Sequence, residues 1–244
     1  MVGQHAAVLT RRGLVFVVWG AAVVVWFVIA PHLSPLALWP AVATASAAVL
    51  PGTLLLVLIA LPLWHERWLL PAAVALALAA WAFTEAGWGL AANFAKMWAA
   101  VFAGWAFLRL FEELSWVVLV ALVIPLVDAI SVWRGPTHAI TSRHFEVYTA
   151  VAIAFLVPGG GAAYLGPPDV LFYALFLGAT MRWRLRPVWT WVAMTGMYSL
   201  TIVIANAAGL DGLPALPFLS FGFLIANGDL LWQRLRKPSV PRTR

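Results

Sequence analysis

The sequence predicts an all-α polytopic membrane protein, a bundle of about eight and possibly nine transmembrane helices. Two observations on composition lead to this fold class: 64% of the residues are hydrophobic and 10% are charged, and the mean hydropathy is +0.95. A soluble domain has roughly 45–50% apolar and about 25% charged residues. The third observation is that apolar residues come in stretches of about 20, the length that an α-helix needs to cross a bilayer. We therefore expect a multi-pass protein of the cell membrane.

Eight apolar stretches provide the candidate spans. The second is longer than a bilayer requires and contains Pro51 and Gly52, so it predicts a kinked helix or two short ones. The stretch 146–157 is apolar but too short to cross, and its β-branched and aromatic residues favour a strand or a surface-lying element. The glycines at 159–161 predict a flexible joint. The predicted spans are residues 13–31, 36–63, 68–84, 89–110, 114–133, 164–181, 187–208 and 214–232.

The basic residues predict which side of the membrane each end of the chain occupies. Cytoplasmic loops carry an excess of Lys and Arg. Eight spans put both termini on one side, and twelve basic residues fall on that side against two, Arg134 and Arg143, on the other. Both termini are therefore expected in the cytoplasm. Lys96 lies inside the fourth span, where we expect it to snorkel or to pair with Glu85. The twelve residues are Arg11, Arg12, Arg67, Arg109, Arg182, Arg184, Arg186, Arg234, Arg236, Lys237, Arg242 and Arg244.

The same basic residues account for the formal net charge of +6. Because they flank the spans, they predict contact with anionic membrane lipids and no binding of nucleic acid. The chain has no Cys, which excludes disulfides and thiolate metal sites, and its five His show no ligand spacing. His138 and His144, the nearest pair, are expected in a wet loop. The sequence thus predicts no metal and no cofactor, and it leaves the oligomeric state open.

Two aspartates, Asp128 and Asp169, are the candidate catalytic residues. Their flanks, 116–133 and 164–179, carry no other charge. An ionisable residue inside a span is costly and is usually functional. In the predicted topology each Asp lies about five residues from the outer end of its span, which is roughly 8 Å below the outer boundary at 1.5 Å per residue. Two carboxyl groups at one depth on consecutive spans can share a proton, as in aspartic proteolysis.

Three elements in the second half of the chain resemble a known family. Asp128 begins DAISVWRGPT, Asp169 sits in GPPDVLFYALFLGA, and the last span opens with LPALP at 213–217. Their order resembles the presenilin and signal peptide peptidase family of intramembrane aspartyl proteases, whose pattern is an Asp, usually after Tyr, then Gly-x-Gly-Asp, then Pro-Ala-Leu. The resemblance implies that the two Asp form the catalytic pair. We accordingly divide the chain into N-terminal scaffold helices, 1–113, and a catalytic region, 114–244.

The resemblance also implies a reaction, the hydrolysis of peptide bonds in transmembrane or signal-peptide-like helices of membrane proteins. One carboxylate would act as general base on a water, while the other, protonated, donates a hydrogen bond to the scissile carbonyl. A substrate helix must unwind to be cut. The LPALP segment has backbone acceptors freed by its prolines and could pair with extended substrate, with 146–157 as the other edge. The predicted substrate-binding residues are Gly166, Tyr173, Pro214, Ala215, Leu216 and Pro217.

Two positions depart from the family pattern. Val127 replaces the usual Tyr, and Pro168 stands where the pattern has its second Gly. Proline suits the first turn of a helix, so Pro168 fits if the helix begins at Pro167 or Pro168. Asp169 would then lie in the first turn, where the helix dipole favours the ionised form and would make Asp169 the base. A helix that began earlier would be kinked at Pro168.

Three other functions remain open on the sequence. A leader-cleaving protease of the prepilin-peptidase type is expected to place its aspartates at the cytoplasmic face and to lack the Pro-Ala-Leu element. An ion-coupled or proton-coupled transporter or leak protein could use the same two intramembrane carboxylates. Because Pro168 replaces the second Gly of the pattern, the protein could also be a catalytically inactive family member that acts as a binding scaffold. LPALP is the sequence feature that favours the intramembrane protease over the first two.

Overall fold

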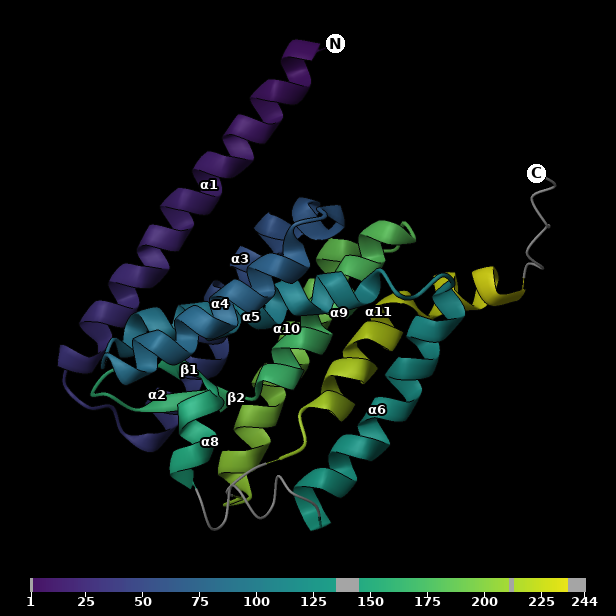
Figure 1. Ribbon diagram of the computed structural model, residues 1–244. Helices are drawn as coiled ribbons and strands as arrows, with labels where there is room; N and C mark the ends of the chain where they lie inside the picture. The colour runs from purple at the N-terminus through teal and green to yellow at the C-terminus, as the bar shows by residue number, and fades with distance from the viewer. Residues whose placement is uncertain (1, 135–144, 211–212, 237–244) are drawn as a thin grey trace.

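The computed structural model of the chain describes residues 2–134, 145–210 and 213–236, which are mostly helical (Figure 1). Among these residues, four helices are long and apolar enough to cross a membrane. This agrees with a helical membrane protein, although four helices meet both criteria where the sequence predicts eight. The predicted wet loop with His138 and His144 lies outside the described residues. The four helices are Arg11–His32, Leu38–His65, Leu114–Ser131 and Pro187–Ala207.

The first two candidate spans differ in regularity. The first belongs to α1 (Val2–Ile29), which stands apart from the other helices at its N-terminal end (Figure 1) and ends in a 3-10 turn, η1 (Ala30–His32). The second is one continuous helical segment with a change of winding inside it. Pro51 has no N–H to donate to the preceding turn, and a π turn just before it accommodates this missing hydrogen bond. Its parts are α2 (Leu38–Thr44), the π turn η2 (Ala45–Val49), α3 (Leu50–Ala60) and the 3-10 turn η3 (Leu61–His65).

The next two helices support the candidate site from one side. α4 (Leu69–Glu85) packs along α5 (Gly89–Leu108), and α5 packs along α9 (Pro167–Arg182). α5 approaches α9 closely at Gly104, where a Cβ atom would lie 2.2 Å from the carbonyl oxygen of Leu171. Only glycine therefore permits this separation of the two helices.

The last two helices and α6 form the opposite side. α10 (Pro187–Ala207), α11 (Leu216–Arg236) and α6 (Leu114–Arg134) lie side by side in that order (Figure 1). Buried Asn227 of α11 donates from Nδ2 to Thr190 Oγ1 of α10 at 2.7 Å. An interhelical bond between side chains of this kind fixes the two helices in register.

A β-hairpin between α6 and α9 departs from the predicted all-α fold. β1 (Ile153–Leu156) pairs antiparallel with β2 (Ala162–Leu165). Within β1, Ile153 and Phe155 are buried while Ala154 and Leu156 are only partly so, the period of two that a strand requires. The predicted strand-or-surface element is thus a strand in its second half, preceded by the short helix α8 (Phe145–Val151). The helix of the predicted sixth span begins only after the hairpin.

The glycines at 159–161 form the turn of this hairpin and not the flexible joint that we predicted. Gly159 and Gly160 have φ of 85° and 81°, the left-handed region that favours glycine. The Gly159 N–H donates to the carbonyl of Ala30 at 3.0 Å, and a Cβ at Gly159 would lie 2.4 Å from Pro35. The turn is therefore anchored against the connection that follows α1.

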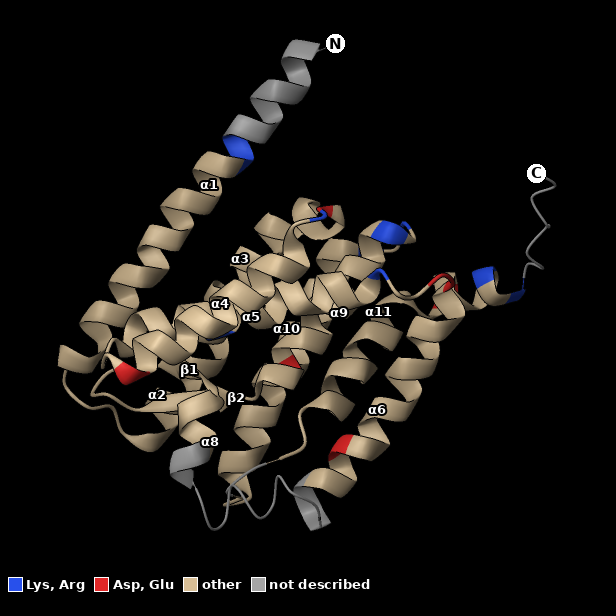
Figure 2. Cartoon of the chain, in the orientation of Figure 1, with Lys and Arg blue, Asp and Glu red and all other residues tan. Residues whose placement is uncertain are grey.

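The basic residues gather towards one end of the helix bundle, the top of the view in Figure 2. Arg109, after α5, donates to the carbonyl of Glu66, after η3, at 3.4 Å. Arg186, before α10, forms an ion pair with Asp229 near the end of α11 at 2.6 Å. Connections that the sequence assigns to one side of the membrane are thus close in space. Four residues of the charge count lie outside the described residues: Lys237, Arg242 and Arg244 of the expected cytoplasmic side, and Arg143 of the other.

Candidate active site

Asp128 lies near the end of α6, three residues after Pro125, which interrupts the hydrogen bonding of that helix. Its Oδ2 accepts a hydrogen bond from the N–H of Leu216 at 3.0 Å. Leu216 is the first residue of α11, and the first amides of a helix have no partner within it. Asp128 therefore caps the N-terminus of α11 from a neighbouring helix.

The LPALP segment consequently lies against Asp128. Pro214, Ala215 and Leu216 are buried, and Pro217 is partly buried. That these residues bind substrate stays a prediction. In the structure the segment contacts the Asp128 carboxylate through its backbone, and the Leu216 N–H holds that carboxylate in place.

Asp169 is the third residue of α9, which begins at Pro167 as the proline argument requires. Pro167 and Pro168 occupy the first two helical positions, where a missing N–H costs no intrahelical bond. The Gly166 N–H donates to Asp169 Oδ2 at 2.9 Å, and the Asp169 N–H donates to the Gly166 carbonyl at 3.1 Å. A Cβ at Gly166 would lie 3.2 Å from Asp169 Oδ2. Gly166 thus orients the carboxylate and leaves space for it.

The two carboxyl groups belong to one electrostatic site. Their helices α6 and α9 are in contact, and the Asp128 carboxyl lies near enough to Asp169 for the two charges to interact. Both carboxyl groups also lie near enough to interact with the phenols of Tyr148 and Tyr198. As whole residues, Asp128 and Asp169 are both partly buried. This coupling agrees with the proximity that their shared depth on consecutive spans predicts.

The helix dipole does not distinguish the two aspartates. Asp169 lies in the first turn of α9, as expected, but Asp128 lies at the N-terminus of α11. Both carboxylates receive the same kind of support from a helix end. The dipole alone therefore gives no preference between the two, because the Asp128 carboxylate also lies at a helix start, and Asp169 as the base stays a prediction.

Tyr148 of α8 is a member of the site that sequence reasoning missed. Partial burial, and then the nearby carboxyl of Asp169, raise the pKa of the Tyr148 phenol, with smaller contributions from Tyr164 and Asp128. Its ring contacts the Tyr164 ring at 6.3 Å between centroids. The phenol stays protonated at neutral pH and can donate a hydrogen bond close to the two carboxyl groups. No spacing in the sequence connects this tyrosine to either Asp.

Two further tyrosines, Tyr173 of α9 and Tyr198 of α10, join these two helices near the start of α9. The Tyr198 hydroxyl donates to the backbone carbonyl of Asp169 at 2.8 Å. The Tyr198 ring stacks on Tyr173 at 5.9 Å between centroids, and the Tyr173 hydroxyl shares a 2.8 Å hydrogen bond with Thr195 Oγ1. Both tyrosines are fully buried. Tyr173, predicted to bind substrate, therefore lies in the α9–α10 interface, where it fixes the helix that carries Asp169.

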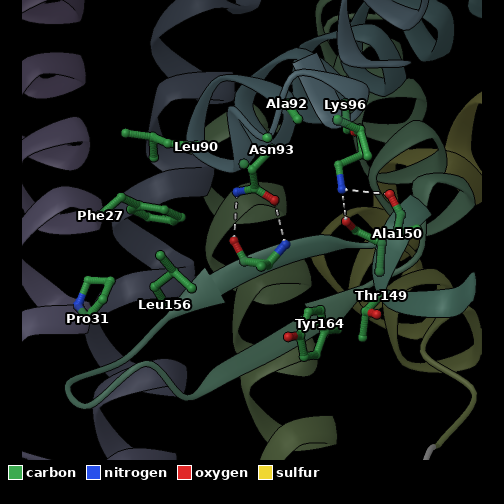
Figure 3. A pocket seen from close by; sticks show the side chains of 15 residues that line it. Phe27, Pro31, Leu90, Ala92, Asn93, Lys96, Thr149, Ala150, Leu156 and Tyr164 are labelled. Carbon is green, nitrogen blue, oxygen red and sulfur yellow. Dashed lines mark hydrogen bonds between the residues drawn. The ribbon is translucent and has the colours of Figure 1, made fainter. Parts of the chain in front are cut away.

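The outer edge of β1 is occupied by side chains (Figure 3). Asn93 of α5 donates from Nδ2 to the Ala154 carbonyl at 2.9 Å, and the Ala154 N–H donates to Asn93 Oδ1 at 2.7 Å. Trp26 of α1 donates from Nε1 to the Leu156 carbonyl at 2.9 Å. The expectation that 146–157 offers an edge to substrate is therefore wrong for β1, because Asn93 binds the N–H and C=O of Ala154 and Trp26 binds the C=O of Leu156.

Lys96 lies one helical turn after Asn93 and faces the same part of the chain (Figure 3). Its Nζ donates to the carbonyls of Ala150 and Ala152 at 3.0 and 2.9 Å. These carbonyls lie at the C-terminal end of α8, where a helix leaves acceptors without partners. The structure thus has Lys96 bound to backbone at the end of α8, and not paired with Glu85 as expected from the sequence. A cavity of about 510 Å³ lies beside these bonds and is lined by residues of α5, of α8 and of the hairpin.

No protein-family model matches the sequence, and no curated protein and no solved structure matches it. Among the described residues, no group of three or more His, Asp or Glu side chains could hold a metal ion. A functional conclusion therefore depends on the arrangement of the two aspartates and the segments that hold them.

Proposed function

We propose that this protein is an intramembrane aspartyl protease that hydrolyses peptide bonds in transmembrane helices with Asp128 and Asp169. The observation that carries the proposal is that two carboxyl groups from different helices interact electrostatically, while each accepts a backbone N–H at the start of a helix. Two carboxyl groups at one site do not both ionise readily, so one stays neutral near neutral pH. The motif resemblance to the presenilin and signal peptide peptidase family supports the same function.

In the proposed reaction, the ionised carboxylate takes a proton from water as the water oxygen bonds to the scissile carbonyl carbon. The neutral carboxyl gives its proton to the carbonyl oxygen, which produces a gem-diol. The C–N bond then breaks as the leaving nitrogen takes one proton from the pair and a diol hydroxyl returns one to it. The products are a new carboxyl end and a new amino end, and the pair returns to its starting protonation. The two groups titrate as a unit.

Substrate is proposed to lie extended along β2. This strand ends at Leu165 and leads directly into Gly166 and Asp169, so a chain bound along it passes the carboxylate. Strand addition supplies the main-chain hydrogen bonds that an unwound substrate needs. The outward groups of β1 are already bound by Asn93 and Trp26, which favours β2 as the docking strand.

We further propose eight crossings with both termini in the cytoplasm and the hairpin on the outer side. Support comes from the four helices that meet the criteria for a span and from the clustering of basic residues at one end. α9 has 16 residues, a length of about 24 Å, which is less than the roughly 30 Å hydrocarbon core. Because Asp169 lies in the first turn of this short helix, water from the outer side has a short path to it.

The test is cleavage of a model transmembrane peptide by the purified protein in detergent. The parent should produce fragments, and Asp128→Asn and Asp169→Asn should produce none while remaining folded. A transporter or leak protein would instead leave the peptide intact. It would also carry protons or cations across proteoliposomes, and the same two variants would lose that flux. This pair of results would contradict the protease proposal.

A further inference from the structure

The β1–β2 hairpin is held in place by helices from the first half of the chain. Asn93 and Lys96 come from α5, and Trp26 comes from α1. An edge strand presents unpaired N–H and C=O groups, which are costly where water is scarce. Side chains distant in sequence therefore bind edge groups of β1 that a further strand would otherwise pair with.

Asn93 imitates a strand most closely. The Val157 N–H donates to the Gly161 carbonyl across the hairpin, so the alternate residues Ala154 and Leu156 direct their backbone groups away from β2. The Asn93 amide binds both the N–H and the C=O of Ala154, the pair of bonds that a neighbouring antiparallel residue would make. Among side chains, a carboxamide supplies both an acceptor and donors for such a pair.

Lys96 holds the element before the hairpin. Its two bonds to Ala150 and Ala152 fix the end of α8, the helix that carries Tyr148. The contacts of Asn93 and Lys96 together set where α8 ends and where β1 begins. A cavity lies beside these contacts (Figure 3), so side chains do not fill the space between α5 and this segment. On that side, the hydrogen bonds of Asn93 and Lys96 position the end of α8 and the start of β1.

We propose that Asn93 is a positioning residue that, with Lys96 and Trp26, keeps the hairpin assembled before substrate arrives. The consequence for catalysis depends on the proposed protease function. Because β2 leads into Gly166 and Asp169, the placement of the hairpin sets the distance between a bound strand and the carboxylates. A preassembled docking strand spares the substrate the cost of ordering it. Loss of the Asn93 bonds therefore raises KM more than it lowers kcat.

The experiment compares the parent with Asn93→Leu, whose side chain branches at the same carbon and makes neither hydrogen bond. We expect amide hydrogen exchange over 153–157, measured without substrate, to quicken by about tenfold or more as two hydrogen bonds are lost. KM for a transmembrane peptide should rise by about tenfold, with kcat within about twofold of the parent. The matched control is Asn206→Leu in α10, whose amide donates to Ile202 of its own helix. This control should alter neither the exchange nor KM.

If Asn93→Leu does not fold, a second variant, Asn93→Asp, tests the positioning role of Asn93. It keeps an acceptor for the Ala154 N–H and removes the donor to the Ala154 carbonyl, so exchange should stay slow at Ala154 itself while KM rises. Unchanged exchange in Asn93→Leu, or faster exchange with an unchanged KM, would overturn the positioning role. If the parent cleaves nothing, the protease proposal fails, and the exchange comparison still decides whether Asn93 holds the hairpin.

Discussion

Replacing Gly104 with Ala is the perturbation whose effect on the candidate site can be worked out most directly. The new Cβ would lie 2.2 Å from the Leu171 carbonyl oxygen and 3.1 Å from the Ala174 Cβ. The first of these atoms belongs to helix backbone and cannot rotate away. Cβ atoms essentially never approach another atom within 3.0 Å, so α5 and α9 must separate by about 0.8 Å or more.

The magnitude follows from this separation. Overpacking of a well-packed interface costs about 1–3 kcal/mol. The gain from replacing glycine by alanine within a helix offsets about 0.5–1 kcal/mol of that. Leu171 lies two residues after Asp169, so the shift moves the carboxylate as well, and a misplacement of about 1 Å can cost on the order of 100-fold in rate. We expect a net loss of about 1–2 kcal/mol in stability and a fall in kcat well beyond that of a surface change.

The assay is thermal unfolding in detergent together with the rate of peptide cleavage. Gly196→Ala in α10 is the control, because no atom lies within 4 Å of a Cβ placed there. This control should gain about 0.5–1 kcal/mol in stability and keep the parental rate. A Gly104→Ala variant as stable and as active as the parent would contradict the claim that the close contact between α5 and α9 sets the position of Asp169.

Three other predictions concern the site and its orientation. Tyr148→Phe removes the phenolic donor beside the carboxyl groups, so kcat should fall by about tenfold or more with little change in KM; an unchanged kcat would exclude a role for this hydroxyl. Pro168→Gly should leave cleavage intact or raise it, because Pro168 occupies a position that needs no N–H, and a lost activity would show that the proline is required. Reporters that are active only in the cytoplasm should be active at both termini, and an inactive C-terminal reporter would overturn the proposed topology.

The start of α9 at Pro167 is a prediction from the sequence that the structure confirms, while the catalytic pairing of the two aspartates stays a prediction. Charge-free flanks and an equal depth on consecutive spans bring Asp128 and Asp169 together, and the start of α9 at Pro167 follows from the rules for proline. Both inferences use local pattern and helix geometry. Neither requires knowledge of which distant segments touch.

The contacts that sequence reasoning missed join distant segments. LPALP reads as a free edge for substrate, but the Leu216 amide binds Asp128, 88 positions away. The hairpin is made of two four-residue strands, whose edge is satisfied by Trp26 and Asn93 from other helices. One signal was present: Asn93 and Lys96 lie three residues apart on one face of an otherwise apolar helix, which indicates a common polar partner.

The most direct measurement is mass spectrometry of a transmembrane peptide incubated with the purified protein in water enriched in ¹⁸O. If Asp128 and Asp169 together activate water, the parent should produce a new carboxyl end that carries ¹⁸O, and neither Asp128→Asn nor Asp169→Asn should produce it. Fragments formed by either variant at the parental rate would contradict the claim that these two carboxyl groups are the catalytic pair.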